Sequence, residues 1–216
     1  MVVQKIQRLR NRKERYRIFF EDGTTVDVGA WTIAKFGIRV GDTIAEKTLN
    51  ELIYFDNKNL AKDCALNYLS YRVRSSYEVR QHLLKKGFTE DIAHDVVKDL
   101  SDLEMLNDVA FARMYLNDQL KRKPQGINLL RQRLLSKGIQ QKTIDALLNE
   151  CVSTQDQQSA ATTLIKKKIP TLSRKKPSSG DYRKLYTYLY SRGFSPEIIR
   201  STLQQFFFGN DIYDSE

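Results

Sequence analysis

The stretch Leu83-Leu-Lys-Lys-Gly87-Phe-Thr-Glu-Asp-Ile92 decides the fold, because related stretches recur twice further along the chain. The second is Leu134-Leu-Ser-Lys-Gly138-Ile-Gln-Gln-Lys-Thr143, and the third is Leu189-Tyr-Ser-Arg-Gly193-Phe-Ser-Pro-Glu-Ile198. Their glycines are 51 and 55 residues apart. Repetition at such a period predicts a tandem array of similar structural units.

Each of these stretches is typical of a helix, a glycine that ends it and a second helix. A glycine just beyond the last turn takes the left-handed conformation at little cost. Lys86, Lys137 and Arg192 precede the three glycines, where a cation interacts favourably with the negative end of the helix dipole. In the third stretch, Ser195 followed by Pro196 is the N-cap and first-turn pair expected where a helix begins.

A further amphipathic helix is predicted before each pair, so that each unit contains three helices. We therefore expect a mainly α fold in which three tandem three-helix repeats form an elongated curved array. The expected parts are an N-terminal domain at 1–60, helical repeats at 61–106, 107–153 and 154–208, and an acidic tail at 209–216.

The first 60 residues have a different pattern. From Arg17 to Val28, β-forming residues alternate on both sides of Asp22-Gly23, which is a strong hairpin signal. A third strand is available at Val2 to Gln7, and Trp31 to Phe36 has the pattern of a short helix. We expect a small β-hairpin domain before the helical array.

Composition narrows the class of protein. The chain of 216 residues is 41% hydrophobic and 10% aromatic, which suffices for a folded core. Its longest uncharged run, Ser201 to Asn210, is ten residues, about half of the roughly 20 that a membrane helix needs. The first residues have no apolar signal region, and Cys64 and Cys151 form no C-x-x-C pair. A cytoplasmic location and no membrane partner are expected.

The net charge of +10, with an isoelectric point near 9.5, indicates a polyanionic partner, nucleic acid first of all. Basic runs precede the second helix of each unit, at Arg72-Val-Arg74, Lys121-Arg122-Lys123 and Arg174-Lys175-Lys176. Stacked repeats would bring such loops to one edge, where they suit a phosphate backbone or an acidic groove. Two alternatives remain open: separately solvated loops that cap the preceding helices, and a basic surface that serves solubility.

Basic residues on the second helices, and those in the turns that follow, would widen the same strip. Ser75 and Glu78 form a capping-box pattern, which leaves Arg74 for binding. The full set of candidate binding residues is Arg72, Arg74, Lys85, Lys86, Lys121, Arg122, Lys123, Arg131, Arg133, Lys137, Arg174, Lys175, Lys176, Arg183 and Lys184.

The order and spacing of two segments resemble the RecX family. The first repeat contains Ala65-Leu-x-Tyr-Leu-x-x-Arg-x-Arg-Ser-x-x-Glu78, and the second contains Leu106-x-Asp-x-x-Phe-Ala-x-x-Tyr115. The resemblance covers residues 61–150 well and 158–208 loosely. Two positions depart from the family pattern, because Asn107 and Arg133 stand where the family tends to carry acids. Both departures make the second repeat more positive.

This resemblance implies a non-enzymatic modulator of the RecA recombinase in recombination and DNA repair. Such proteins bind the RecA–DNA filament and reduce its ATPase activity and strand exchange. The expected partners are therefore the RecA filament and the DNA phosphate backbone, with the chain itself a monomer. No cofactor, metal site or catalytic residue is expected. The alternative is a stand-alone DNA-binding protein, because a helix–glycine turn–helix unit is similar to a helix-turn-helix.

Overall fold

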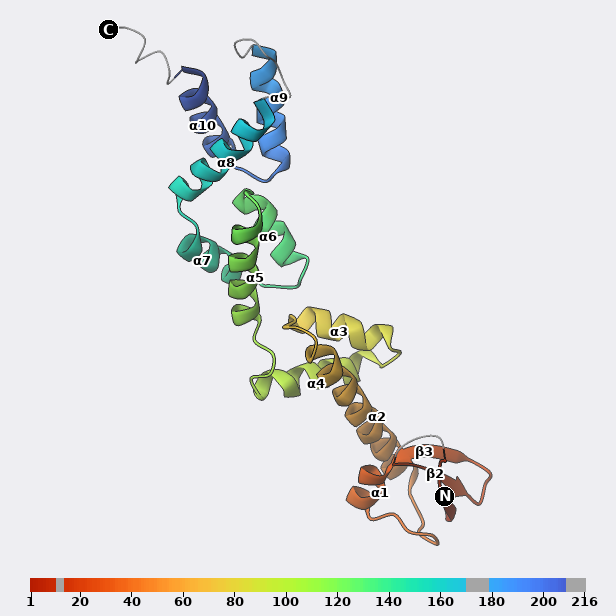
Figure 1. Ribbon diagram of the computed structural model, residues 1–216. Helices are drawn as coiled ribbons and strands as arrows, with labels where there is room; N and C mark the ends of the chain where they lie inside the picture. The colour runs from red at the N-terminus through yellow and green to blue at the C-terminus, as the bar shows by residue number, and fades with distance from the viewer. Residues whose placement is uncertain (11–13, 170–178, 209–216) are drawn as a thin grey trace, which may run out of the picture. The chain divides into compact units, whose positions relative to one another are not determined.

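The structure is a computed structural model that describes residues 1–10, 14–169 and 179–208 (Figure 1). It divides into two compact units. The first comprises Met1–Val73 and Val79–Leu106, and the second comprises Arg74–Glu78 and Asn107–Glu216. The mainly helical fold with a small N-terminal sheet is confirmed, and each unit is described by itself below.

The first unit begins with a three-stranded antiparallel sheet. Its strands are β1 (Val3–Arg8), β2 (Arg15–Phe20) and β3 (Thr25–Gly29), in the order β1-β2-β3. Gly23 has φ 84° in the tight turn between β2 and β3, and the Asp22 carboxylate accepts a 2.9 Å hydrogen bond from the Thr24 amide. The predicted hairpin and third strand are thus confirmed.

Two helices cover one face of this sheet. The short helix α1 (Ala30–Phe36) follows β3 directly, and the long helix α2 (Glu46–Leu69) packs beside it. The sheet, α1 and α2 share one buried cluster, to which Ile18, Phe20 and Leu52 contribute fully buried side chains. Because α2 runs for 24 residues without a turn, the boundary expected after residue 60 falls inside a helix.

A buried carboxylate fastens α2 to the sheet. Asp56 is 4% exposed and accepts hydrogen bonds from the Arg15 guanidinium at 2.6 Å, the Gly29 amide at 2.7 Å and the Thr32 hydroxyl at 2.7 Å. Burying a charge is costly unless it is paired and hydrogen-bonded, and all three donors reduce that cost. Asp56 therefore helps to fix the position of α2 against β2 and β3.

The C-terminal half of α2 is also the first helix of the first repeat. It packs with α3 (Ser76–Lys85) and α4 (Glu90–Asp102) around a cluster that includes Ala65, Leu83 and Leu100. The Tyr54 hydroxyl donates to Asp95 at 2.7 Å, and this bond raises the pKa of Tyr54 to about 12. One helix thus serves both the sheet and the first repeat.

The second unit contains two complete three-helix repeats. Their helices are α5 (Asp108–Arg122), α6 (Ile127–Leu135), α7 (Gln141–Cys151), α8 (Thr154–Lys168), α9 (Ser179–Ser191) and α10 (Pro196–Phe208). Each repeat buries its own apolar cluster. With the first repeat, they confirm the predicted set of three.

The three repeat glycines take the predicted left-handed conformation. The φ angles are 91° at Gly87, 77° at Gly138 and 85° at Gly193. The following helices start where the sequence indicates, with Thr89 and Gln140 at the N-cap positions of α4 and α7 and α10 beginning at Pro196. Local sequence therefore fixes these turns.

Two of the glycine turns also form contacts that we call repeat joints. At the first joint, within the second unit, the Ser75 hydroxyl donates to the carbonyl oxygen of Lys137 at 2.7 Å. At the second joint, the Gly126 amide donates to the carbonyl oxygen of Arg192 at 2.9 Å. Lys137 and Arg192 each precede the repeat glycine, so the two joints use the same acceptor position.

The joints leave no room for a side chain at their glycines. A Cβ built on Gly138 would lie 2.3 Å from the Tyr77 Cβ, and one on Gly193 would lie 2.4 Å from the Leu129 nitrogen. By contrast, a Cβ on Gly87 would meet nothing within 4 Å among the described residues. Glycine is therefore needed at Gly138 and Gly193 for two reasons: the backbone is left-handed there, and a neighbouring residue packs against the position of the missing Cβ.

This difference predicts unequal effects of one substitution at two similar turns. Gly87→Ala should cost only the left-handed conformation, about 1–2 kcal/mol of unfolding free energy. Gly193→Ala should cost a further 1–3 kcal/mol or so, because the Leu129 backbone must shift. Urea denaturation followed by far-ultraviolet circular dichroism measures both. Equal losses of stability at the two glycines would contradict the close approach at the second joint.

A second prediction concerns the buried carboxylate. Asp56→Asn should lower the unfolding free energy by about 3 kcal/mol, because the Arg15 guanidinium would keep its charge and lose its partner. Glu51→Gln is the matched control, since Glu51 is exposed on the same helix, and should change stability by less than about 0.5 kcal/mol. If both variants unfold at the same urea concentration, Asp56 does not fasten α2 to the sheet.

Candidate polyanion-binding surface

An exposed cationic run ends helix α5. Lys121, Arg122 and Lys123 are all exposed, and Lys123 is the C-cap residue. Arg122 forms an exposed ion pair with Asp118 at 3.0 Å, one helical turn earlier, and such pairs contribute little. Within the described residues, Lys121 and Lys123 form no ion pair. The run therefore presents positive charge to solvent, while its place at the helix end also favours cations by itself.

The residues that follow this run have a structural role. Gln125 and Gly126 are buried, and a Cβ on Gly126 would lie 2.0 Å from the Gly193 carbonyl carbon. The predicted basic loop thus divides into an exposed cationic half and a buried half that forms the second repeat joint. Because the joint fixes the backbone at Gly126, it also limits where the preceding cations can lie.

The corresponding loop of the first repeat is similarly divided. Arg72 is exposed, and its guanidinium turns back to donate to the carbonyl oxygen of Val73 at 2.9 Å. Arg74 is half-buried and Ser75 is fully buried. The predicted capping box is present, since the Glu78 amide donates to the Ser75 hydroxyl oxygen at 3.2 Å and the Ser75 amide to the Glu78 carboxylate at 3.4 Å.

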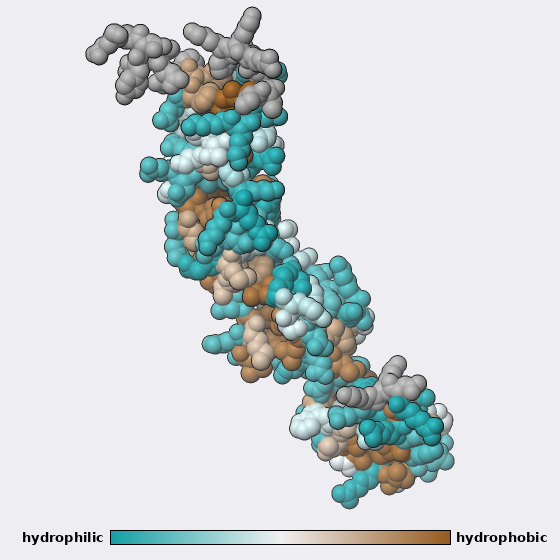
Figure 2. Space-filling model, viewed as in Figure 1, coloured by the Kyte–Doolittle hydropathy of each residue, from teal (hydrophilic) through white to brown (hydrophobic). Residues whose placement is uncertain are grey.

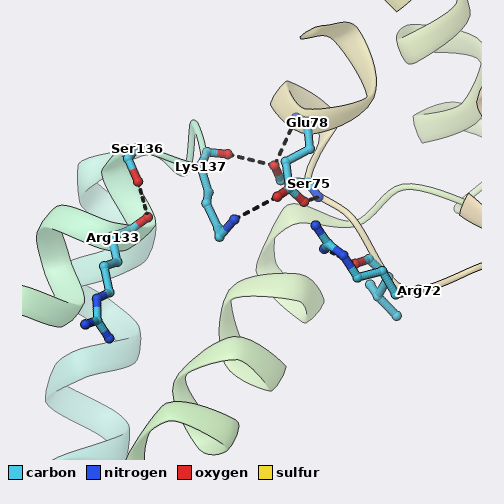
Figure 3. Close-up of polar contacts among 7 residues, drawn as sticks. Arg72, Ser75, Glu78, Arg133, Ser136 and Lys137 are labelled. Carbon is cyan, nitrogen blue, oxygen red and sulfur yellow. Dashed lines mark hydrogen bonds and ion pairs between the residues drawn. The ribbon is translucent and has the colours of Figure 1, made fainter. Parts of the chain in front are cut away.

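Lys137 takes part in the first joint. Its ammonium group lies 2.7 Å from the Glu78 carboxylate, and both side chains are largely buried (Figure 3). Figure 3 also shows the Lys137 carbonyl oxygen facing Ser75. Removing one partner of such an ion pair leaves an uncompensated charge. Lys137 therefore stabilises the first joint.

Two further candidates on α6 are held by neighbouring side chains. Arg131 binds the Asp145 carboxylate at 3.0 Å and the Asn128 side chain at 2.9 Å. The pKa of Asp145 is lowered, first by a hydrogen bond from Gln141 and then by the one from Arg131. Arg133 donates to two neutral glutamine side chains at 2.8 Å. Both arginines therefore help to hold the second repeat together.

The remaining described candidates lie at the end of α3 and on α9. Lys85 and Lys86 are exposed at the end of α3 and form no ion pair within the described residues. Arg183 is exposed on α9, and the exposed Lys184 lies 3.9 Å from Asp181. Three predicted residues, Arg174, Lys175 and Lys176, lie outside the described residues.

Two buried glutamines at the second joint are not among the residues predicted from the sequence. Gln157 on α8 is 4% exposed, and its side-chain oxygen accepts a 3.0 Å hydrogen bond from the Ile127 amide. Gln125, 5% exposed, donates to the carbonyl oxygen of Gln119 at 3.2 Å. No local pattern identifies them, because glutamine is mostly exposed in helices. Only the meeting of two repeats makes these side chains structural.

The exposed candidates thus present positive charge to solvent. Hydrophilic residues cover much of the visible surface (Figure 2). In residues 1–10, 14–169 and 179–208, no group of three or more His, Cys, Asp or Glu side chains could hold a metal ion. None of the helices in that part of the chain is both long and apolar enough to cross a bilayer.

The comparisons with known proteins agree with the three-repeat architecture. Residues 61–100, 107–148 and 155–203 match the family domains described as the first, second and third three-helix domains of RecX. The matches correspond closely to the helical repeats of the structure.

Full-length relatives extend the similarity to the N-terminal sheet. The chain is 32% identical to the regulatory protein RecX of Bacillus licheniformis, over 97% of this chain and 79% of that protein. It is 30% identical to that of Bacillus subtilis, over 97% and 78%. A crystal structure of regulatory protein RecX superposes with a TM-score of 0.73, at 24% identity, over 94% of this chain and 98% of the other. The chain belongs to the RecX family of regulatory proteins.

Proposed function

We propose that this protein regulates a RecA recombinase by binding the recombinase–DNA filament through the exposed cations of its helical repeats. Membership of the RecX family supports regulation as the general role. The filament as target follows from the family resemblance, and a filament supplies both acidic protein surface and DNA phosphate. The net charge of +10 is complementary to such a partner.

The observation that carries this proposal is the Lys121–Lys123 run. These three side chains are exposed, and the second joint follows at Gly126, three residues after the run. Binding costs less when the contacting segment is already ordered, because fewer conformations are lost. The joint therefore makes this run a better ligand for phosphate or carboxylate groups than an equally charged flexible tail.

Regulation would follow from differential binding. A protein that binds one state of a filament more tightly than another shifts the filament towards that state without any chemical step. Covering the groove where a second duplex enters would reduce strand exchange in the same way. Both effects need only that the cationic runs contact the filament.

Sequence-specific reading of DNA by α6 is the weaker alternative. A recognition helix needs arginine, asparagine or glutamine side chains available for base edges. On α6, Arg131 is bound by Asp145 and Asn128, and Arg133 by two glutamines. Footprinting on random duplexes would identify this activity by a defined protected site.

A charge-reversal variant tests the proposal. Lys121→Glu, Arg122→Glu and Lys123→Glu combined should raise the concentration needed for half-inhibition of the cognate recombinase ATPase at least tenfold, because three attractive interactions become repulsive. The measurement is ATP hydrolysis by filaments on single-stranded DNA, with circular dichroism to check the fold.

The matched control changes the same amount of charge elsewhere. Lys47, Lys98 and Lys142 are exposed and form no ion pair within the described residues. Their combined reversal to glutamate should shift half-inhibition by less than about twofold, apart from the general effect of net charge. Equal effects of the two triple variants would refute a specific role for the run that ends α5.

A further inference from the structure

The N-terminal domain has an uneven distribution of charge that the proposed function does not use. Residues 1–20 contain seven basic side chains and one acidic side chain. Residues 21–60 contain four basic and seven acidic side chains. The positive charge of the domain therefore belongs to β1, β2 and the residues between them in the sequence.

The sheet directs part of this charge to one face, which we call the outer sheet face. Ile18 and Phe20 point into the core, so Phe19 between them points the other way. The strand register pairs Lys5 with Phe19 and Gln7 with Arg17. Lys5, Gln7, Arg17 and Phe19 therefore share the face that α1 and α2 do not cover.

Phe19 has no packing role comparable to that of its neighbours. It is half-exposed and lies outside the buried cluster of the domain. The Lys5 ammonium group lies 5.8 Å from the centre of its ring. An aromatic ring on an open sheet face, with a cation beside it, is the arrangement on which unpaired bases stack.

The charges on the face differ from one edge to the other. Arg17 makes a two-pronged contact with Asp27 of β3, at 2.6 and 2.9 Å, which balances its charge. On β1, the exposed Lys5 forms no ion pair within the described residues, whereas Arg8 pairs with Tyr16 and lies on the other face of the sheet. A polyanion would therefore follow the β1 side of the sheet, with Phe19 next to its path.

We propose that the outer sheet face binds single-stranded nucleic acid, with Phe19 stacking on a base and Lys5 contacting a phosphate. A duplex would use the cations but not the ring, because its bases are already stacked on one another. An acidic peptide would likewise bind the cations but offer no base to stack on the ring of Phe19. This site is independent of the proposed contacts of the helical repeats.

The first test removes the aromatic ring from the full-length protein. Phe19→Leu should weaken binding of a fluorescein-labelled dT20 oligonucleotide about tenfold, because the ring no longer stacks on a base. Phe19→Tyr keeps a ring and should bind within about twofold of the unaltered protein. Fluorescence anisotropy at several salt concentrations measures both, and rU20 in parallel shows whether the site prefers DNA or RNA.

A duplex of the same length is the specificity control. Its affinity should change less than twofold in the Phe19→Leu variant. If dT20 and the duplex weaken equally, or if neither changes, Phe19 does not stack on a base and the proposal is wrong. Phe19 lies outside the core, so the melting temperature should remain unchanged in this variant.

The second test uses salt dependence to detect the phosphates that the β1 side neutralises. Each phosphate that a protein neutralises on a single strand adds roughly 0.7 to the slope of log affinity against log salt. Lys5→Gln should therefore reduce this slope for dT20 by about 0.7. Lys47→Gln is the matched control and should leave the slope unchanged. Equal slopes for both variants would exclude the β1 side as the path of the strand.

Photocrosslinking separates this site from the helical repeats. An oligonucleotide with bromodeoxyuridine should crosslink to Phe19, which tandem mass spectrometry distinguishes from Trp31 in the same tryptic peptide, residues 18–35. The crosslink should persist when Lys121, Arg122 and Lys123 are all changed to glutamate. Crosslinks confined to the repeats would overturn this proposal and leave filament binding by the repeats untouched.

Discussion

The second unit depends on one recurring hydrogen bond, accepted by the carbonyl group just before a repeat glycine. Ser75 supplies the donor from its side chain, and Gly126 supplies it from its backbone. A side-chain hydroxyl at one joint and a backbone amide at the other therefore donate to the same acceptor position. The end of a helix leaves carbonyl groups without partners inside the helix, and Ser75 or Gly126 satisfies one of them at each joint.

This constraint links packing to charge. The joint needs a small residue or a short hydroxyl side chain at Ser75 and Gly126, and the exposed cations of each loop stand just before that position. The Lys121–Lys123 run lies between the body of α5 and the second joint, so it can present charge at low entropic cost. The second unit thus combines a fixed connection between its two complete repeats with exposed cations, which suits the proposed binding to an extended polyanionic partner.

The N-terminal sheet is held to α2 by a buried carboxylate. Asp56 concentrates three donors on one buried carboxylate and so holds the sheet against a helix that continues into the first repeat. The packing of α1 and α2 covers one face of the sheet. The opposite face remains uncovered by α1 and α2, and among the described residues Lys5 on β1 is its cation without an ion pair, because Asp27 neutralises Arg17.

The sequence by itself determined the repeat glycines, the helices on either side of them, the hairpin and the Ser75–Glu78 cap, because these depend on neighbours within a few residues. It also identified the exposed cations of α5. Only the tertiary structure decided that Lys137, Arg131 and Arg133 are held by partners, and that Gln125 and Gln157 are buried. Those roles arise between residues up to 59 positions apart, as in the Glu78–Lys137 pair, and no local pattern encodes such a meeting.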